Sequence, residues 1–195
     1  NLMQWSIAMQ MHLLENNNLL PEVGGERASG DDSKAWYVSL PAYLGIPDPV
    51  NDPSLASRDK LVGPLRIWRD PAYGGELQSA DGEFVFTYGM NRFLQPDIDN
   101  PPYRIHELEN PAITVFMTEK TGSDPGMLPQ DAEFRYRRSG TAAANVLYCD
   151  GHVELIDDSS LLSFASWPEL PTLEGLTTWS PYPGAPEPDW SQIGR

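Results

Sequence analysis

The 195-residue sequence predicts an α+β fold in which one N-terminal helix packs on a small antiparallel sheet with long irregular loops. The first residues carry apolar side chains at helical spacing, and the middle of the chain contains several short β-prone runs. An Asp150-Gly151 pair separates the last two of these runs, which is a strong hairpin signal. The 19 prolines and 16 glycines favour many turns over a helical bundle.

A helix is predicted within residues 1–20, and it has two apolar faces instead of the usual one. One stripe at helical spacing consists of Leu2, Trp5, Met9 and Leu13, and the second consists of Met3, Ile7, Met11 and Leu14. A helix with two apolar faces contacts both its own domain and a neighbouring subunit, or else its own domain surrounds it. Both alternatives stay open from the sequence. The asparagines at 16–18 and Pro21 end the helix.

The whole chain, residues 1–195, is expected to form a single domain. Its regions are the helix at 1–20, a loop-rich αβ region at 21–111, a sheet with a hairpin at 112–160, and a Pro- and Trp-rich tail at 168–195. Short strands are predicted at 65–68, 83–88 and 112–117, and a short helix or an extended segment at 36–44.

The hairpin is predicted to turn on a two-residue loop formed by Asp150 and Gly151. In that register Cys149 faces His152 and Tyr148 faces Val153, and directly opposed residues share a face of the sheet. The expected core face carries Val146, Tyr148, Val153 and Leu155, and the partly wet face carries Leu147, Cys149, His152 and Glu154. Cys149 and His152 would supply only two of the four ligands of a zinc site, so the hairpin is interpreted as structural.

The net charge of −15 argues against nucleic acid and anionic lipid as partners. The sequence contains neither a G-x-S-x-G nor an H-E-x-x-H motif, and its three histidines, at 12, 106 and 152, form no pair in the sequence. The protein is therefore predicted not to be an enzyme.

Calcium is the most plausible ligand, because Ca²⁺ prefers several oxygen ligands. Asp97, Asp99 and Asn100 place three oxygen-bearing side chains on one loop. The pairs Asp31-Asp32 and Asp157-Asp158 are weaker candidates. The alternative, a solvated acidic loop without a metal, stays open.

Four segments resemble one family in the same order along the chain. Asn1–Ala8 is similar to the Asn-Leu-Lys-Gln-Ile-Gly-Leu-Ala helix segment of prepilin-type, pseudopilin-like proteins that carry a so-called H-X9-DG segment. Leu40–Leu44 resembles the Leu-Leu-Pro-Tyr-Leu stretch of that family, and Thr87–Arg92 resembles its Ser-Tyr-Gly-Met-Asn segment. Ala144–Val153 resembles its Ala-Asn-Val-Leu-Phe-Ala-Asp-Gly-His-Val hallmark, and the signature residues are Asn145, Asp150, Gly151 and His152. Arg138 stands nearest to the place of the family's first histidine.

The resemblance implies a structural subunit of a type II secretion pseudopilus or a type IV pilus-like filament, assembled through its N-terminal helix. The implied partners are other pseudopilin subunits and secretion-system components. The full-length form would be anchored in the inner membrane by a removed N-terminal segment, with the head in the periplasm or at the cell surface, whereas this chain would be soluble. Major pseudopilins bind calcium, which supports the calcium prediction.

The alternative function is a secreted ligand- or glycan-binding module that uses Trp-rich loops. Its surface would be lined by Trp36, Trp68, Trp167, Trp179 and Trp190. The sequence upstream of Asn1 would discriminate between the two functions, because a prepilin cleavage site followed by an apolar anchor supports the filament subunit.

Overall fold

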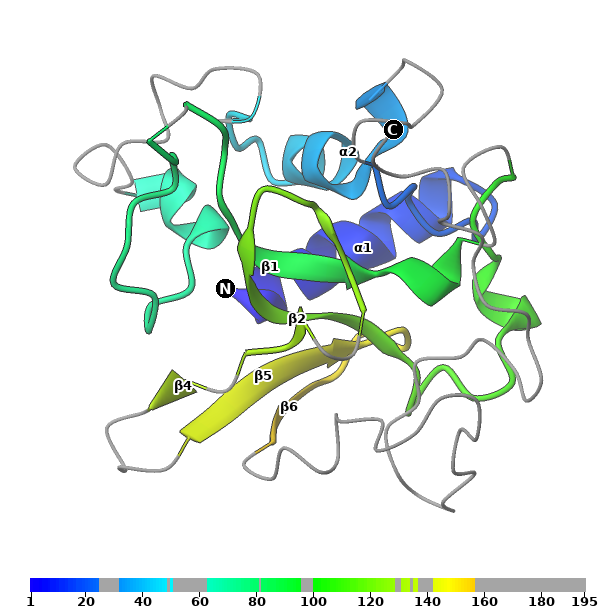
Figure 1. Cartoon of the computed structure of the whole chain (residues 1–195). Helices are drawn as coiled ribbons and strands as arrows, with labels where there is room; N and C mark the ends of the chain where they lie inside the picture. The colour runs from blue at the N-terminus through cyan, green and yellow to red at the C-terminus, as the bar shows by residue number, and fades with distance from the viewer. Residues whose placement is uncertain are drawn as a thin grey trace.

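The computed structural model describes residues 1–24, 32–48, 50, 63–80, 82–95, 100–128, 131–133, 135–136 and 142–156. Within these residues, helix α1 (Leu2–Glu15) crosses one face of a sheet and helix α2 (Trp36–Tyr43) lies beside it (Figure 1). The short 3₁₀ helices among these residues are η1 (Asp32–Lys34), η4 (Gly63–Trp68), η5 (Arg92–Leu94) and η6 (Ile105–Glu107). The predicted α+β class is confirmed.

Helix α1 ends where the sequence predicts, because three consecutive asparagines follow it. Asn17 and Asn18 adopt left-handed conformations, with φ of 53° and 62°, which asparagine tolerates better than most residues. The Asn18 amide donates to the Leu13 carbonyl at 2.8 Å and so satisfies one of the last carbonyls of the helix. Segment 36–44, for which the sequence left helix and extended structure open, is helical over α2.

The sheet is mixed, so the prediction of a purely antiparallel sheet is wrong. Its strands are β1 (Phe86–Asn91), β2 (Val115–Gly122), β3 (Gly126–Met127), β4 (Arg135–Tyr136), β5 (Ala142–Tyr148) and β6 (Val153–Ile156). The order is β3-β1-β2-β5-β4, and β6 also pairs with β5. Strand β3 pairs with β1 in parallel, because the chain passes from one edge of β1 to the other between β2 and β3.

This crossover is held over β1 by Lys120. The ammonium group donates to the carbonyls of Asp124 at 2.7 Å and Gly126 at 2.8 Å. The side-chain stem runs directly above Gly89, where a Cβ atom would lie 2.4 Å from the Lys120 Cδ. A glycine in the middle of β1 thus makes room for a buried lysine, and the lysine fixes the parallel strand.

The predicted strand at 65–68 is wrong, because these residues belong to the 3₁₀ helix η4. Leu65, Ile67 and Trp68 are all buried there, and a short apolar run does not distinguish a strand from a helical turn. The proline at position 64 fixes a φ that suits the first turn of a helix. The strands predicted at 83–88 and 112–117 exist, but each begins three residues later and continues further.

The β5–β6 hairpin has a register that differs by one residue from the predicted one. Leu147 faces Val153 and Val146 faces Glu154, so the loop contains three residues, Cys149 to Gly151. The Gly151 amide donates to the Tyr148 carbonyl at 2.9 Å and Gly151 has φ of 97°. This is the arrangement of a turn followed by a left-handed glycine, which serves three-residue hairpin loops.

The shifted register corrects the predicted faces of the hairpin. Leu147 and Cys149, which were expected to be partly wet, are fully buried on the side of α1. Val146 and Tyr148 are buried in a second apolar cluster with Val115 and Ile156. Leu155, which was expected in the core, is exposed. Both sides of β5 are therefore buried, which an alternating pattern of one wet and one dry face does not anticipate.

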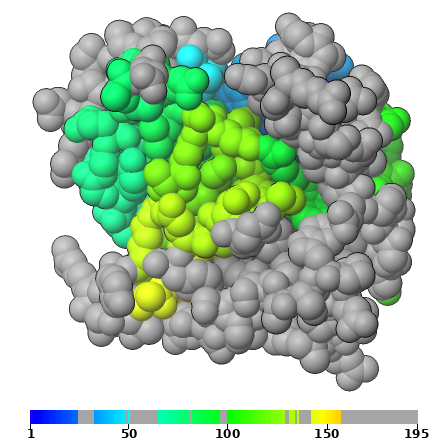
Figure 2. All heavy atoms as spheres, viewed as in Figure 1, coloured from blue at the N-terminus to red at the C-terminus, as the bar shows by residue number. Residues whose placement is uncertain are grey.

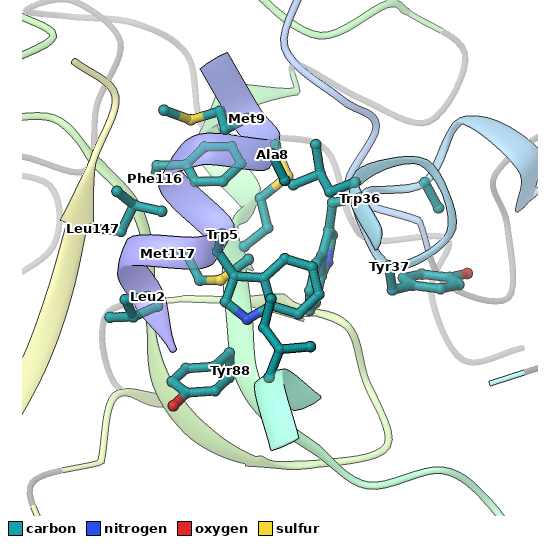
Figure 3. Close-up of a cluster of buried hydrophobic side chains, with 14 of the residues drawn as sticks. Leu2, Trp5, Ala8, Met9, Trp36, Tyr37, Tyr88, Phe116, Met117 and Leu147 are labelled. Carbon is teal, nitrogen blue, oxygen red and sulfur yellow. The ribbon is translucent and has the colours of Figure 1, made fainter. Parts of the chain in front are cut away.

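The main core lies between α1, α2 and the sheet (Figure 3). Three tryptophans meet there: the ring of Trp5 stands edge-on to Trp36 at 5.4 Å and to Trp68 at 5.2 Å. Such aromatic pairs contribute about 0.5–1.5 kcal/mol each beyond the area that they bury. The close-up also shows Leu2, Trp5, Ala8 and Met9 projecting from α1 into this cluster.

Candidate functional site

The two apolar stripes of α1 have different surroundings in the structure. The inner stripe, Leu2, Trp5, Met9 and Leu13, is buried against the domain. The outer stripe, Met3, Ile7, Met11 and Leu14, is exposed by 61%, 50%, 41% and 82%. The domain therefore does not surround the helix within the described residues, and one of its apolar faces is open.

The outer stripe is a compact and nearly uncharged surface. At about 100° per residue, its four side chains fall within an arc of about 80° on the side of α1 opposite the core. Glu15 is the only charged residue of α1, although the whole chain carries a net charge of −15. In Figure 1 the sheet lies in front of α1, and in the same view Figure 2 shows green and yellow atoms of the sheet region on the side towards the viewer.

One polar seam of α1 is bound to the β5–β6 loop. The Ser6 hydroxyl donates to the Gly151 carbonyl at 2.5 Å, and Gln10 Nε2 donates to the Asp150 carbonyl at 3.3 Å. At about 100° per residue Ser6 and Gln10 lie between the two apolar stripes, on one side of the helix. Their spacing of four residues was the available signal in the sequence, but it indicated no partner.

Gly151 allows the loop to approach α1 this closely. A Cβ atom at this position would lie 2.7 Å from Gln10 Nε2 and 3.2 Å from Ser6 Oγ. Its φ of 97° is also a conformation that residues with a side chain rarely adopt. The backbone conformation therefore favours glycine here, and a side chain at this position would in addition push aside the Ser6 and Gln10 side chains that bind the loop.

The outward side of the loop carries Asp150 and His152. One Asp150 carboxylate oxygen accepts the His152 amide at 3.0 Å and lies 2.7 Å from His152 Nδ1. The His152 ring stacks on Tyr148 at 4.3 Å with an interplanar angle of 11°. Cys149 is fully buried in the same loop, and burial raises the pKa of its thiol well above the ordinary value.

Asn145, the remaining signature residue, has an internal structural role. Its side-chain amide donates to Glu119 Oε1 at 2.5 Å, and its backbone amide donates to the same oxygen at 3.2 Å. Glu119 is fully buried in β2, and a buried carboxylate requires such donors. Asn145 thus supplies hydrogen-bond donors to an acidic side chain at the centre of the sheet. The sequence identified Asn145 but gave no sign of its partner.

The predicted calcium ligands are described only in part. Asp97 and Asp99 lie outside the described residues, as do Asp31 and Asp157-Asp158. Asn100 is exposed, and its backbone carbonyl accepts a hydrogen bond from Gln95 Nε2 at 3.3 Å. In the part of the chain that the structure describes, no three His, Cys, Asp or Glu side chains are grouped so that they could hold a metal.

Two of the five tryptophans that the alternative function would place on a binding surface lie inside the domain. Trp36 and Trp68 are almost completely buried, so the expectation that they line a binding surface is wrong. Their indole N–H groups donate to the carbonyls of Pro125 and Pro47 inside the domain. Trp167, Trp179 and Trp190 lie outside the described residues.

The histidines occupy separate environments. His12 is buried on α1, where its ring stands edge-on to Tyr43, and burial lowers its pKa. His106 lies in η6, and His152 is paired with Asp150. The three histidines thus lie in three different parts of the described structure.

Comparison of the chain with known proteins finds no match among family models, curated sequences or solved structures. Among the described residues, the helices fall short of the length and apolar character that crossing a membrane demands.

Proposed function

We propose that this protein is a structural subunit of a filament, of the type II secretion pseudopilus or type IV pilus-like kind, and that it assembles through α1. The observation that carries the proposal is the outer stripe. A helix of a monomeric domain buries its apolar face and exposes polar residues, whereas α1 buries one apolar stripe and exposes another.

The distribution of exposed apolar side chains supports this proposal. Five large hydrophobic side chains are exposed among the described residues, and four of them form the outer stripe. Single exposed apolar residues are ordinary, but a contiguous set indicates an interaction surface. The fifth, Leu155, lies apart from α1 in the sequence, on β6.

The outer stripe by itself would hold two copies together only weakly. Full burial of one Leu, Ile or Met side chain contributes about 1.5–3 kcal/mol, so covering the exposed parts of these four contributes roughly 4–7 kcal/mol per copy and roughly 7–14 kcal/mol when two copies cover each other's stripes. Association itself costs about 4–15 kcal/mol in lost freedom of motion. In a filament each subunit touches several neighbours, so weak contacts between pairs of subunits support one another along the array.

The proposal extends to partners and location through the resemblance of Asn1–Ala8 and Ala144–Val153 to prepilin-type proteins. The partners would be further pseudopilin subunits and secretion-system components. The full-length form would be anchored in the inner membrane, with this domain in the periplasm or at the cell surface. No enzymatic activity is proposed. Burial of Trp36 and Trp68 weighs against the alternative of a secreted binding module.

The test replaces Ile7 by glutamate in the full-length protein, expressed with its own assembly machinery. We expect Ile7→Glu to abolish filament formation, because a carboxylate would be buried without a partner at the subunit contact. The purified domain should lose little stability, since Ile7 is half exposed. Filaments are measured by electron microscopy of sheared fractions, and domain stability by thermal unfolding.

The matched control is Leu155→Glu, which makes the same kind of change at an apolar side chain of similar exposure on β6, outside the outer stripe. It should leave filament formation intact. If Ile7→Glu assembles as well as the unmodified protein, α1 is not the assembly surface and the proposal fails.

A further inference from the structure

The two apolar stripes of α1 pose a problem of specificity. Each stripe contains four large side chains at helical spacing, so the apolar pattern alone allows the helix to pack in either of two rotations about its axis. Folding requires that one rotation be favoured. A buried or half-buried polar contact is a common means of selecting one apolar packing over another.

The polar contacts in the middle of α1 come from the β5–β6 loop. Ser6 and Gln10 lie on one seam of the helix, and both donate to carbonyls of this loop. The other polar anchors are at the ends: Asn1 Nδ2 donates to the Arg66 and Arg69 carbonyls, and Asn16 Nδ2 donates to the Tyr43 hydroxyl. The contacts at the two ends fix the position of the helix along its axis. The contacts of Ser6 and Gln10 lie on one side of the helix, so they restrict its rotation about that axis.

The β5–β6 loop is held firmly enough by its own hydrogen bonds to fix the orientation of α1. Its turn is closed by the hydrogen bond from the Gly151 amide to the Tyr148 carbonyl and by the bond from the His152 amide to the Asp150 carboxylate. The side chain of Cys149 is buried in the main core and so attaches the loop to the domain. The two carbonyls that accept from α1 are therefore fixed relative to the sheet.

We propose that the β5–β6 loop sets the rotation of α1 about its axis and thereby determines which apolar stripe faces outward. Ser6, Gln10 and Gly151 are positioning residues in this account. The biological consequence rests on the proposed function, because presentation of the outer stripe matters only if a partner binds it. The rotation itself is a property of the single chain.

The six methionines of the chain allow a direct test. Met3 and Met11 belong to the outer stripe, Met9 to the inner stripe, and Met90, Met117 and Met127 are fully buried in the sheet. Hydrogen peroxide converts accessible methionine to the sulfoxide, and the rate at each residue is read by mass spectrometry. In the unmodified chain we expect Met3 and Met11 to be oxidised at least about tenfold faster than Met9.

The variant is Ser6→Ala combined with Gln10→Ala. It should raise the oxidation rate of Met9 at least about threefold relative to Met90, Met117 and Met127, as the helix turns or rocks about its axis. Gly151→Ala, which pushes a Cβ atom against the same seam, should shift the pattern in the same sense. Gln4→Ala, on the other flank of α1, is the matched control and should leave the pattern unchanged.

Two results would overturn the inference. If Met9 stays as protected as in the unmodified chain, the inner stripe alone sets the rotation. If Met9 and the three sheet methionines all react faster by the same factor, the seam contributes to overall stability and not to rotation. Neither result depends on assembly, so an unchanged pattern together with loss of filaments in Ile7→Glu would remove this inference and keep the proposed function. If the oxidation pattern shifts as expected but Ile7→Glu still forms filaments, the proposed function fails and this inference stands.

Discussion

Gly151 combines two requirements that can be separated by substitution. Gly151→Ala should lower the free energy of unfolding by about 2–4 kcal/mol, because alanine is strained at φ of 97° and its Cβ atom meets Gln10. Gly82 is the control for strain alone: its φ is 87°, but the nearest atom lies 3.9 Å from the position of a Cβ. Gly82→Ala should cost about 1 kcal/mol. Equal losses for the two variants in urea titrations would show that space next to α1 is not limiting.

Cys149 should make stability depend on alkaline pH. In the unfolded chain the thiol ionises near its ordinary pKa of 9.0, whereas burial raises the pKa of the folded thiol well above that value. Above pH 9 the folded state therefore holds more protons, and stability falls as the pH rises, by at most about 1.4 kcal/mol per pH unit.

Comparison with Cys149→Ala isolates this effect. The difference in unfolding free energy between the two proteins should change in favour of the variant between pH 8.5 and pH 10. The folded thiol should also resist a thiol reagent that modifies it readily in denaturant. Rapid modification of the native protein at pH 8 would contradict the burial of Cys149.

At the scale of the element, β2 shows how a charged residue stabilises an irregular part of the sheet. Burial lowers the pKa of Lys120 from 10.5 to about 8, although Asp131 partly opposes the effect of burial. Between pH 8 and pH 10.5 the unfolded chain binds the proton and the folded chain releases it. Stability from this group is therefore reduced below pH 8 and recovers as the pH rises through that window.

Lys120→Met provides the test. At pH 7 the variant should lose about 1–3 kcal/mol, because the carbonyls of Asp124 and Gly126 lose a donor. The advantage of the unmodified protein over the variant should grow by about 1–3 kcal/mol between pH 7 and pH 10.5. An advantage that shrinks over this range would mean that the Lys120 pKa is not lowered in the fold.

The same elements explain how far the sequence could predict the structure. The helix and its two stripes were predictable, because residues that repeat at helical spacing interact locally. The structure at the end of β2 was not predictable, because a lysine in a sequence is expected at the surface. Lys120 is buried because it donates to the carbonyls of Asp124 and Gly126 in the segment that follows. The hairpin register was wrong by one residue, since Asp-Gly serves both two- and three-residue loops.

For the candidate site, the outer stripe could be predicted, but its exposure could not. The sequence left open whether the domain surrounds α1, and only the packed structure shows Ile7 and Leu14 in solvent. The contacts of Ser6 and Gln10 join residues about 140 positions apart, as Ser6 to Gly151 and Gln10 to Asp150. A local pattern can single out Ser6 and Gln10, but it cannot identify partners at that separation.

For the whole molecule, the net charge of −15 opposes any contact between two copies. Repulsion is weakest at the outer stripe, because α1 carries a single carboxylate, Glu15. Assembly through this surface should therefore strengthen with salt, since ions screen the repulsion between subunits while apolar burial persists. At 0.5 M salt, charges beyond roughly 4 Å are largely screened.

The expected outcome is more sedimentable filament at about 0.5 M than at about 0.05 M NaCl, because the screening length falls several-fold between the two. Ile7→Glu should show no such gain. Loss of filament with added salt would indicate that ion pairs, and not the outer stripe, hold the subunits together.

The anchoring of α1 also has a mechanical consequence. Among the described residues, the helix is attached to the rest of the domain at Asn1, at the seam of Ser6 and Gln10, and at Asn16, and beyond its end Leu19 pairs with Arg104. A pull along the helix axis loads these hydrogen bonds in shear, so they share the force instead of breaking one after another. If the proposed filament pulls on α1, the tension would reach several distant parts of the chain at once, and the domain would resist being unfolded away from its helix.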